Sequence, residues 1–257
     1  MKKRPSTGIL ILFILFCLIY AQIAFASSAT VGVSNDGTLA YNSSYHWSTT
    51  NPNQPVPQEA VESNQTVEIQ ITVTSISGSI INTTKTYRYQ NGTEQFVTGY
   101  ADAASGDNEE VGAFFFVSSN LSVGDRVYPS GLYGDTINQT LQREYAGSQR
   151  EVLLDSSTYS FEYNTTVDDI QATRVLNSQI DYYFDKQTGV CLEQREQTTV
   201  TDPNTNYSET TISLIELKQT NLWGAPAFPT ITVTVIFAFV IALIIAVLAV
   251  VLRRRKT

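Results

Sequence analysis

Residues 66–74 read TVEIQITVT, and this stretch decides the fold class of the chain. The apolar residues Val67, Ile69, Ile71 and Val73 alternate with polar ones, and a period of two residues is typical of a strand with one buried face. Before the C-terminal end, no stretch shows the 3.6-residue period of a long amphipathic helix. We therefore expect a β fold.

The same pattern continues downstream. A Ser-Gly-Ser turn at 77–79 leads into a second predicted strand at 80–90. Asn91-Gly92 is a strong short hairpin signal and leads into a third strand at 94–100. Further alternating or apolar stretches predict the remaining strands at residues 113–117, 141–145, 150–154, 159–163, 180–185, 190–200 and 207–217.

Short turns between these strands predict an all-β antiparallel meander, shaped as a curved sheet or half-barrel. Only residues 58–63 and 167–177 are candidates for a helical turn or two. The stretch 51–57 is expected to be a loop, because proline fixes φ and lacks a backbone donor. No linker divides the middle of the chain, so we expect one domain over residues 27–222, large enough for a real core.

Both ends of the chain carry membrane-related signals. Three basic residues at 2–4 precede an apolar run at 8–20 and an Ala-x-Ala pattern at 24–26, which predicts a signal peptide over residues 1–26. Residues 231–252 hold no charge. As a helix they would be about 33 Å long, which matches the hydrocarbon core of a bilayer. We expect one C-terminal transmembrane helix there.

The basic cluster that follows this helix sets the orientation. Residues 253–256 read RRRK, so the tail 253–257 is expected in the cytoplasm. The juxtamembrane linker 223–230 and the domain 27–222 are then extracellular, as in a single-pass type I protein. Surface-sorting signals, from which the helix is removed, have the same layout. Because the stretch 225–229, APAFP, matches no sorting motif, we expect the helix to remain in the cell membrane.

Charge is unevenly distributed along the chain. The formal net charge is −8, from 16 basic and 24 acidic residues. Seven basic residues lie at the two ends, so the middle carries 9 basic against 24 acidic groups, a net charge of −15. A surface of this sign repels phosphate backbones, so we expect no nucleic-acid partner. Attraction of cations or basic partners, and simple solubility at a cell surface, both remain open.

Eight Asn-x-Ser/Thr sequons lie in the middle of the chain, and none has Pro at its second position. In an exported domain such sites accept N-linked glycans. The alternative is that Asn, Ser and Thr are simply common in exposed strands and turns. The candidate glycosylation sites are Asn42, Asn64, Asn82, Asn91, Asn120, Asn138, Asn164 and Asn206.

Catalytic chemistry has little support in the sequence. His46 is the only histidine, and Cys191, the only cysteine after residue 17, lies in an apolar stretch typical of a buried residue. Two acidic loops, at 107–110 and from Asp202, match calcium loops only in part. We expect no catalytic residue, no metal and no cofactor. The carboxylate pairs considered for a hydrolase are Asp168 with Asp169, Asp181 with Asp185, and Glu193 with Glu196.

Aromatic residues are spread over successive predicted strands. One interpretation is a packed core wall, because aromatic rings bury a large area. The other is a concave face that takes an apolar ligand. The candidate ligand-facing aromatics are Tyr87, Tyr89, Tyr100, Tyr145, Tyr182 and Phe184.

Four stretches, in this order, carry a resemblance: NLSVGDRVY at 120–128, REYAG at 143–147 with REV at 150–152, YYFDKQTGV at 182–190, and TNLW at 220–223. Together they resemble uncharacterised archaeal single-pass surface proteins with an exported β-rich ectodomain and one C-terminal helix. The D-K-x-T-G hairpin is also similar to hairpins in half-barrel lipoprotein carriers of the periplasm. Neither resemblance supplies catalytic residues.

The sequence thus predicts a membrane-anchored cell-surface protein that is not an enzyme and acts in binding or display. Its partner would be a surface protein, a polymer or a lipid. The first alternative is a carrier of lipid or another hydrophobic ligand, which would use a concave aromatic face. The second alternative is an exported hydrolase.

Overall fold

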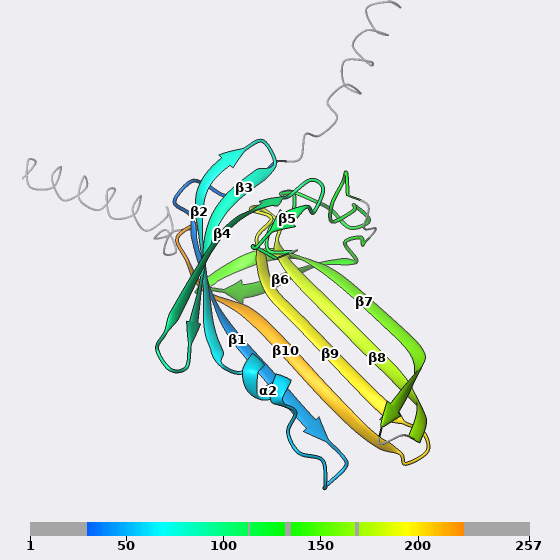
Figure 1. Ribbon diagram of the computed structural model, residues 1–257. Coiled ribbons are helices and arrows are strands. Elements are labelled where there is room, and N and C mark those ends of the chain that lie inside the picture. Colours follow the sequence, from blue (N-terminus) through cyan, green and yellow to red (C-terminus); the bar gives the residue numbers. More distant parts are fainter. Residues whose placement is uncertain (1–29, 113, 132–134, 168–169, 224–257) are drawn as a thin grey trace, which may run out of the picture.

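The computed structural model describes residues 30–112, 114–131, 135–167 and 170–223. Within these ranges the chain forms one antiparallel sheet of ten strands and one short helix (Figure 1). The strand order is β5-β4-β3-β2-β1-β10-β9-β8-β7-β6, so the sheet is open, with β5 and β6 at its two edges. The prediction of an all-β antiparallel fold is confirmed.

The elements before the long loop at 110–138 are β1 (Thr38–Thr49), α2 (Gln58–Ser63), β2 (Thr66–Ser77), β3 (Ile80–Tyr89), β4 (Glu94–Asp102) and β5 (Asn108–Glu109). The elements after it are β6 (Gln139–Tyr145), β7 (Ser148–Val167), β8 (Ile170–Asp185), β9 (Cys191–Asp202) and β10 (Tyr207–Thr220).

The topology consists of two meanders that meet where the first strand pairs with the last. β1 pairs with β10 from Leu39↔Thr220 to Thr49↔Glu209, and on its other side with β2. Neither β1 nor this long-range pairing is predicted from the sequence, because no local turn signal links strands so far apart.

Two local predictions are wrong, and one is confirmed. Residues 58–63 form the helix α2, as expected. The other candidate helical stretch is extended: Val167 ends β7, and residues 170–177 lie in β8. Of the predicted strand at 113–117, the described residues 114–117 lie instead in the long loop, where Phe116 makes an isolated bridge to Val190. Its apolar character comes from burial of Phe115, Phe116 and Val117 beneath the sheet rather than from strand pairing.

The apolar core lies at one end of the sheet. Ile69, Ile71 and Val73 of the fold-deciding stretch are buried there beside Leu39 and Tyr41 of β1. A second cluster forms where the long loop covers β7, β8 and β9, with Leu153, Phe184 and Cys191 on the sheet side. We call this region the packed end.

Polar contacts fix the packed end as well. The buried Tyr41 hydroxyl donates to the carbonyl of Cys191 at 2.8 Å and so links β1 to β9. Arg150 donates two parallel hydrogen bonds, of 2.7 and 2.8 Å, to the fully buried Asp185. The guanidinium carbon of Arg150 lies 4.5 Å from the ring centroid of Trp223. Arg150 of β7 therefore links the hairpin turn at 185–189 to Trp223, which follows β10.

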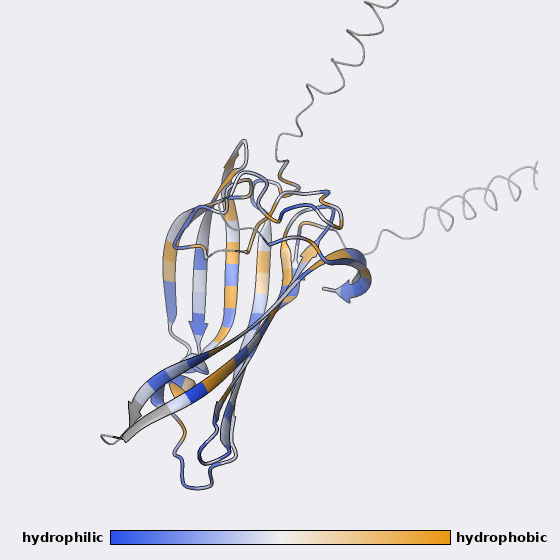
Figure 2. Cartoon of the chain, turned by 90° about the vertical axis from the view of Figure 1, so that its right-hand side faces the viewer, coloured by the Kyte–Doolittle hydropathy of each residue, from blue (hydrophilic) through white to orange (hydrophobic). Residues whose placement is uncertain are grey.

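The far halves of the strands extend beyond this core (Figure 1). We call this region the blade and define it as residues 156–167 of β7, 170–181 of β8, 194–202 of β9 and 207–214 of β10. Among its described side chains only Ser178 and Asp181 are buried, and both are polar. Hydrophobic and hydrophilic residues alternate along these strands (Figure 2). The blade therefore has no apolar core of its own.

The predicted membrane segments fall outside this description. The signal peptide at 1–26, the transmembrane helix at 231–252, the tail at 253–257 and all of the linker 223–230 except Trp223 lie beyond the described residues. In the described part of the chain, no helix has the length and apolar character needed to cross a bilayer.

Candidate functional site

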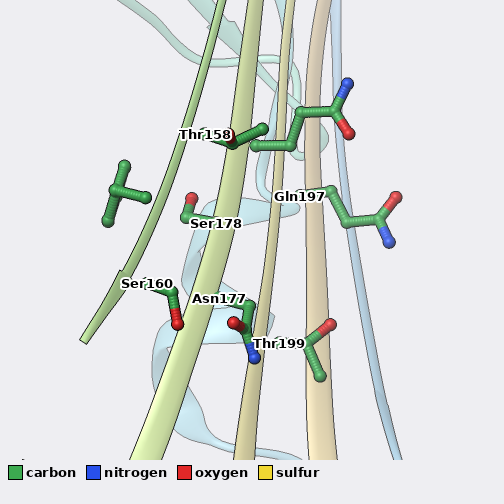
Figure 3. Close-up of a pocket in the computed structure, with 8 residues that line it drawn as sticks. Thr158, Ser160, Asn177, Ser178, Gln197 and Thr199 are labelled. Carbon is green, nitrogen blue, oxygen red and sulfur yellow. The ribbon is translucent and has the colours of Figure 1, made fainter. Parts of the chain in front are cut away.

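A groove of about 530 Å³ lies on one face of the blade (Figure 3). Strand register builds it from two cross-strand rows. The first row is Thr158, Gln179 and Gln197, and the second is Ser160, Asn177 and Thr199. Directly opposite residues of antiparallel strands share a face, so these six side chains point to the same side of the sheet. Ser178 and Tyr159 also border the groove, but their side chains alternate with these rows and point to the opposite face of the sheet.

Buried polar contacts orient part of this lining. The Nε2 atom of Gln179 donates to both carboxylate oxygens of Asp181, at 3.2 and 3.1 Å. Ser156 donates to Asp181 Oδ1 at 2.5 Å. The carbonyl oxygen of Gln179 therefore remains available to a ligand. The amides of Asn177 and Gln197 have no hydrogen-bond partner among the described residues, so both are available as donors and acceptors.

The groove lining carries no formal charge. Amide and hydroxyl groups both donate and accept hydrogen bonds, as the hydroxyl groups of a sugar do. The ring of Tyr159, 43% exposed, lies on the opposite face of the sheet and does not contribute to this groove. This arrangement suits a neutral polyhydroxylated ligand and offers no nucleophile paired with a base.

Neither of the two carboxylate pairs in the described part of the chain is arranged as a catalytic pair. Asp185 is held by Arg150, and Asp181 is held by Ser156 and Gln179. Glu193 lies opposite Tyr183, whereas Glu196 lies opposite Ile180. Those two glutamates therefore point to opposite faces. Asp168 and Asp169 lie outside the described residues.

The lone histidine and the lone thiol have no catalytic partner in the described part of the chain. His46 is exposed on β1 opposite Ile212. Cys191 is buried, and its thiol donates to the carbonyl of Glu193 at 3.5 Å. Burial raises the pKa of Cys191 to about 12, so the thiol stays protonated and unreactive at physiological pH.

Metal-ligating groups are also dispersed. In the described ranges, no three His, Cys, Asp or Glu side chains are close enough to hold a metal ion. Asp202 instead stabilises its own turn, where its Oδ1 accepts a hydrogen bond from the backbone of Asn204 at 2.8 Å.

The six candidate ligand-facing aromatics do not share one surface. Phe184 is fully buried and Tyr145 nearly so, whereas Tyr182 stacks on Phe114 of the long loop at 4.2 Å. The remaining three, Tyr87, Tyr89 and Tyr100, are half-buried on β3 and β4 at the other end of the strand order.

A different set of rings is exposed or half-buried. Tyr159, Phe161 and Tyr163 follow one another on the same face of β7, with centroids 6.2 and 6.0 Å apart. The sequence shows their alternation, but it does not show that this part of β7 lies at a sheet edge without a covering layer. That requires the strand order.

One buried acidic residue is not predicted from the sequence. Asp155 is 2% exposed, and its Oδ2 atom has no hydrogen-bond partner in the described structure. Burial, and then the nearby Asp135, raise the pKa of Asp155 to about 7. Its sequence neighbours, Leu154 and Ser156, do not indicate that Asp155 is buried, because its burial depends on the loop at 114–138, which is distant in the sequence.

The sequons occupy accessible positions. Asn82 is half-buried on β3, and its Nδ2 donates to Ser75 of β2 at 3.0 Å. The remaining seven are exposed: Asn42, Asn64, Asn91, Asn120, Asn138, Asn164 and Asn206. Attachment of glycans to these sites stays a prediction.

Comparisons with known proteins give no family. No protein-family model matches the chain, and no curated protein matches it. One solved structure that aligns is described as a candidate thioesterase II from Thermobifida fusca, with 9% identity over 77% of this chain and 84% of that one. Its TM-score is 0.15, so it carries no argument about fold or function.

Proposed function

We propose that this chain is a membrane-anchored cell-surface protein without enzymatic activity, and that its blade binds neutral glycans of the cell envelope. Residues 27–222 form the extracellular domain, 231–252 the anchor and 253–257 the cytoplasmic tail. The observation that carries the proposal is the groove on the blade, lined by uncharged amide and hydroxyl groups.

The blade supports this function because its strands contribute little to the core. In a two-layered protein, each sheet buries one face against another layer. Strands without such a layer leave their side chains available for binding. The blade exposes both faces and is rich in Thr, Ser, Asn and Gln. Such side chains bind sugars by hydrogen bonds.

The carrier function is the second candidate. A curved, half-barrel sheet with a concave aromatic wall would suit a lipid, and the aromatic residues Tyr159, Phe161 and Tyr163 favour some apolar contact. Against it, the rings expected to face the ligand are divided between the core and two separate strand groups. An exported hydrolase has the least support, since no described carboxylate pair forms a cleft.

Binding to immobilised polysaccharides tests the proposal with the full chain in detergent. Neutral, acidic and amino-sugar polymers would be compared, with and without Asn177→Ala and Gln197→Ala. We expect binding to neutral polymers and a loss of at least fivefold in each variant. Gln142→Ala, an exposed glutamine of β6, serves as the control and should bind as the wild type does. Equal binding by all variants would exclude the groove.

Topology is tested separately. Protease added outside intact cells should digest the domain at 27–222 and leave a C-terminal tag protected. Digestion of the tag, with the domain protected, would reverse the proposed orientation.

A further inference from the structure

The outer edge of β7 is unpaired over most of its length. β6 pairs only with residues 148–154 of this 20-residue strand. The backbone N–H of Ser156 is then capped by the side chain of Asn138. Residues 157–167 pair with β8 on one side, and no described strand pairs with them on the other. This free edge is about 35 Å long.

Such an edge is a template for another strand. In an antiparallel strand, alternate residues direct both their N–H and C=O groups to one side, so about five residues offer unpaired groups here. Natural proteins protect long edges with Pro, Lys, bulges or a covering element. Residues 157–165 read STYSFEYNT, without Pro or Lys. The β7–β8 register runs through this stretch without a bulge.

The opposite edge of the sheet differs. β4 pairs with β5 only at Ala101↔Asn108, which leaves the shorter stretch 94–99. Phe96 is 64% exposed there, and its strand neighbour Glu94 forms an ion pair with Arg88. This edge carries a single ring and therefore serves as a comparison.

The free edge of β7 carries three rings in a row. Phe161 is 49% exposed, and its ring stacks on that of Tyr159 with an interplanar angle of 9°. On the other side of Phe161 follows Tyr163, whose ring is tilted by 52°. Aromatic pairs across antiparallel strands stabilise a sheet.

We propose that the free edge of β7 binds the same edge of a second copy of this chain, as an antiparallel two-fold pair centred on Phe161. In this register Phe161 lies opposite its own copy, and Tyr159 lies opposite Tyr163 of the second copy. All three rings then gain a cross-strand aromatic partner. An isologous interface requires a self-complementary patch, and this palindromic order of rings supplies one.

Neighbouring registers are less favourable. In a two-fold antiparallel pair, the numbers of any two opposite residues add up to the same sum. Directly opposite residues share a face, so this sum is even and the two-fold axis passes through one residue. The alternative registers are therefore centred on the neighbouring residues. A pair centred on Glu162 would place two like charges opposite each other, which is destabilising. A pair centred on Ser160 would leave Tyr163 opposite Ser157. The pair centred on Phe161 sets Glu162 opposite the neutral Ser160.

The sequon at Asn164 is compatible with this pairing. Its Oδ1 atom accepts a hydrogen bond from Thr173 on β8 at 3.0 Å. The side chain is therefore held toward β8 and away from the free edge. The proposal is also independent of glycan binding, because it rests on the backbone edge and the ring face rather than on the groove.

The oligomeric state of the full chain in detergent tests the proposal, by light scattering after size exclusion and by sedimentation. We expect a dimer for the wild type. Phe161→Lys sets two positive charges at the centre and should raise the dissociation constant at least tenfold. Phe96→Lys, the matched substitution on the β4 edge, should leave the dimer unchanged. A wild-type monomer throughout the micromolar range would overturn the proposal.

Two substitutions at Ser160 test the register. Ser160→Glu places a second acid opposite Glu162 of the other copy and should weaken the dimer. Ser160→Lys places a base there and should preserve or strengthen it. Equal effects of both substitutions would exclude the register centred on Phe161. Because glycan binding is measured on Asn177 and Gln197 variants, either proposal can fail while the other stands.

Discussion

The packed end and the blade consist of the same strands, yet they are stabilised differently. At the packed end, Phe184 and Leu153 of β8 and β7 are fully buried under the long loop. Farther along the same strands and on the same face, Phe161 of β7 lies opposite Leu176 of β8 with no layer above it. In the blade, the strands are therefore held together by strand pairing without core packing. Stability should depend on the first region and interaction on the second.

Removing one aromatic ring from each region tests this difference most directly. Phe184→Ala removes a fully buried ring and should lower the free energy of unfolding by about 3–5 kcal/mol. Phe161→Ala removes a half-exposed ring and should change it by about 0.5 kcal/mol or less. Denaturant titration of the full chain in detergent, under conditions where it is monomeric, measures both. Similar losses for the two variants would mean that Phe161 stabilises the fold as much as a core residue does.

Ion pairs give a second contrast. Arg150 pairs with the buried Asp185 at 2.7 Å, whereas Arg174 of the blade pairs with Glu209 at 3.6 Å. Arg150→Ala leaves a buried carboxylate without its partner and should cost about 3 kcal/mol. Arg174→Ala should cost at most about 1 kcal/mol, because both partners are partly exposed. The same titrations measure the difference, and an equal cost would contradict this distinction.

The sequence predicts one region better than the other. Alternation at 66–74 and the turns at 91–92 and 185–189 predict β2, β3, β4, β8 and β9, since these signals are local. It does not predict that β1 pairs with β10, nor that the apolar run at 113–117 fills a loop beneath the sheet. Those features depend on contacts between distant residues.

The candidate site shows the same limit. Tyr159 and Phe161 alternate visibly in the sequence, but their exposure depends on the distant long loop, which covers this face at Leu153 and does not cover it farther along β7. The groove residues Asn177, Gln179 and Gln197 carry no motif, because strand register alone brings them together. The predicted sequons, in contrast, are local, and seven of the eight are exposed.

The acid buried at the boundary between the two regions should make stability depend on pH. Because the pKa of Asp155 is raised from 3.8 to about 7, the folded chain keeps this proton up to about pH 7, whereas the unfolded chain loses it near pH 4. Its contribution is therefore favourable at low pH and declines as pH rises from about 4 to about 7.

Asp155→Asn replaces the titratable carboxyl group by an uncharged amide of nearly the same size and shape. We expect the variant to be more stable than the wild type at pH 8 by about 4 kcal/mol, and the difference to shrink toward pH 4. Unfolding free energies at several pH values measure it. Parallel curves for the two proteins over this range would show that Asp155 does not titrate as proposed. Asp202→Asn, in the exposed turn of the blade, is the matched control.

The smallest effect comes from a single hydroxyl. Tyr41→Phe keeps the ring against Phe115, 5.3 Å away, but removes the donor to the buried carbonyl of Cys191. An unsatisfied buried acceptor costs about 1–2 kcal/mol, so the unfolding free energy should fall by that amount. Tyr159→Phe removes an exposed hydroxyl from the blade and should leave stability unchanged. If Tyr41→Phe also proved neutral, the link between β1 and β9 would be made by packing alone.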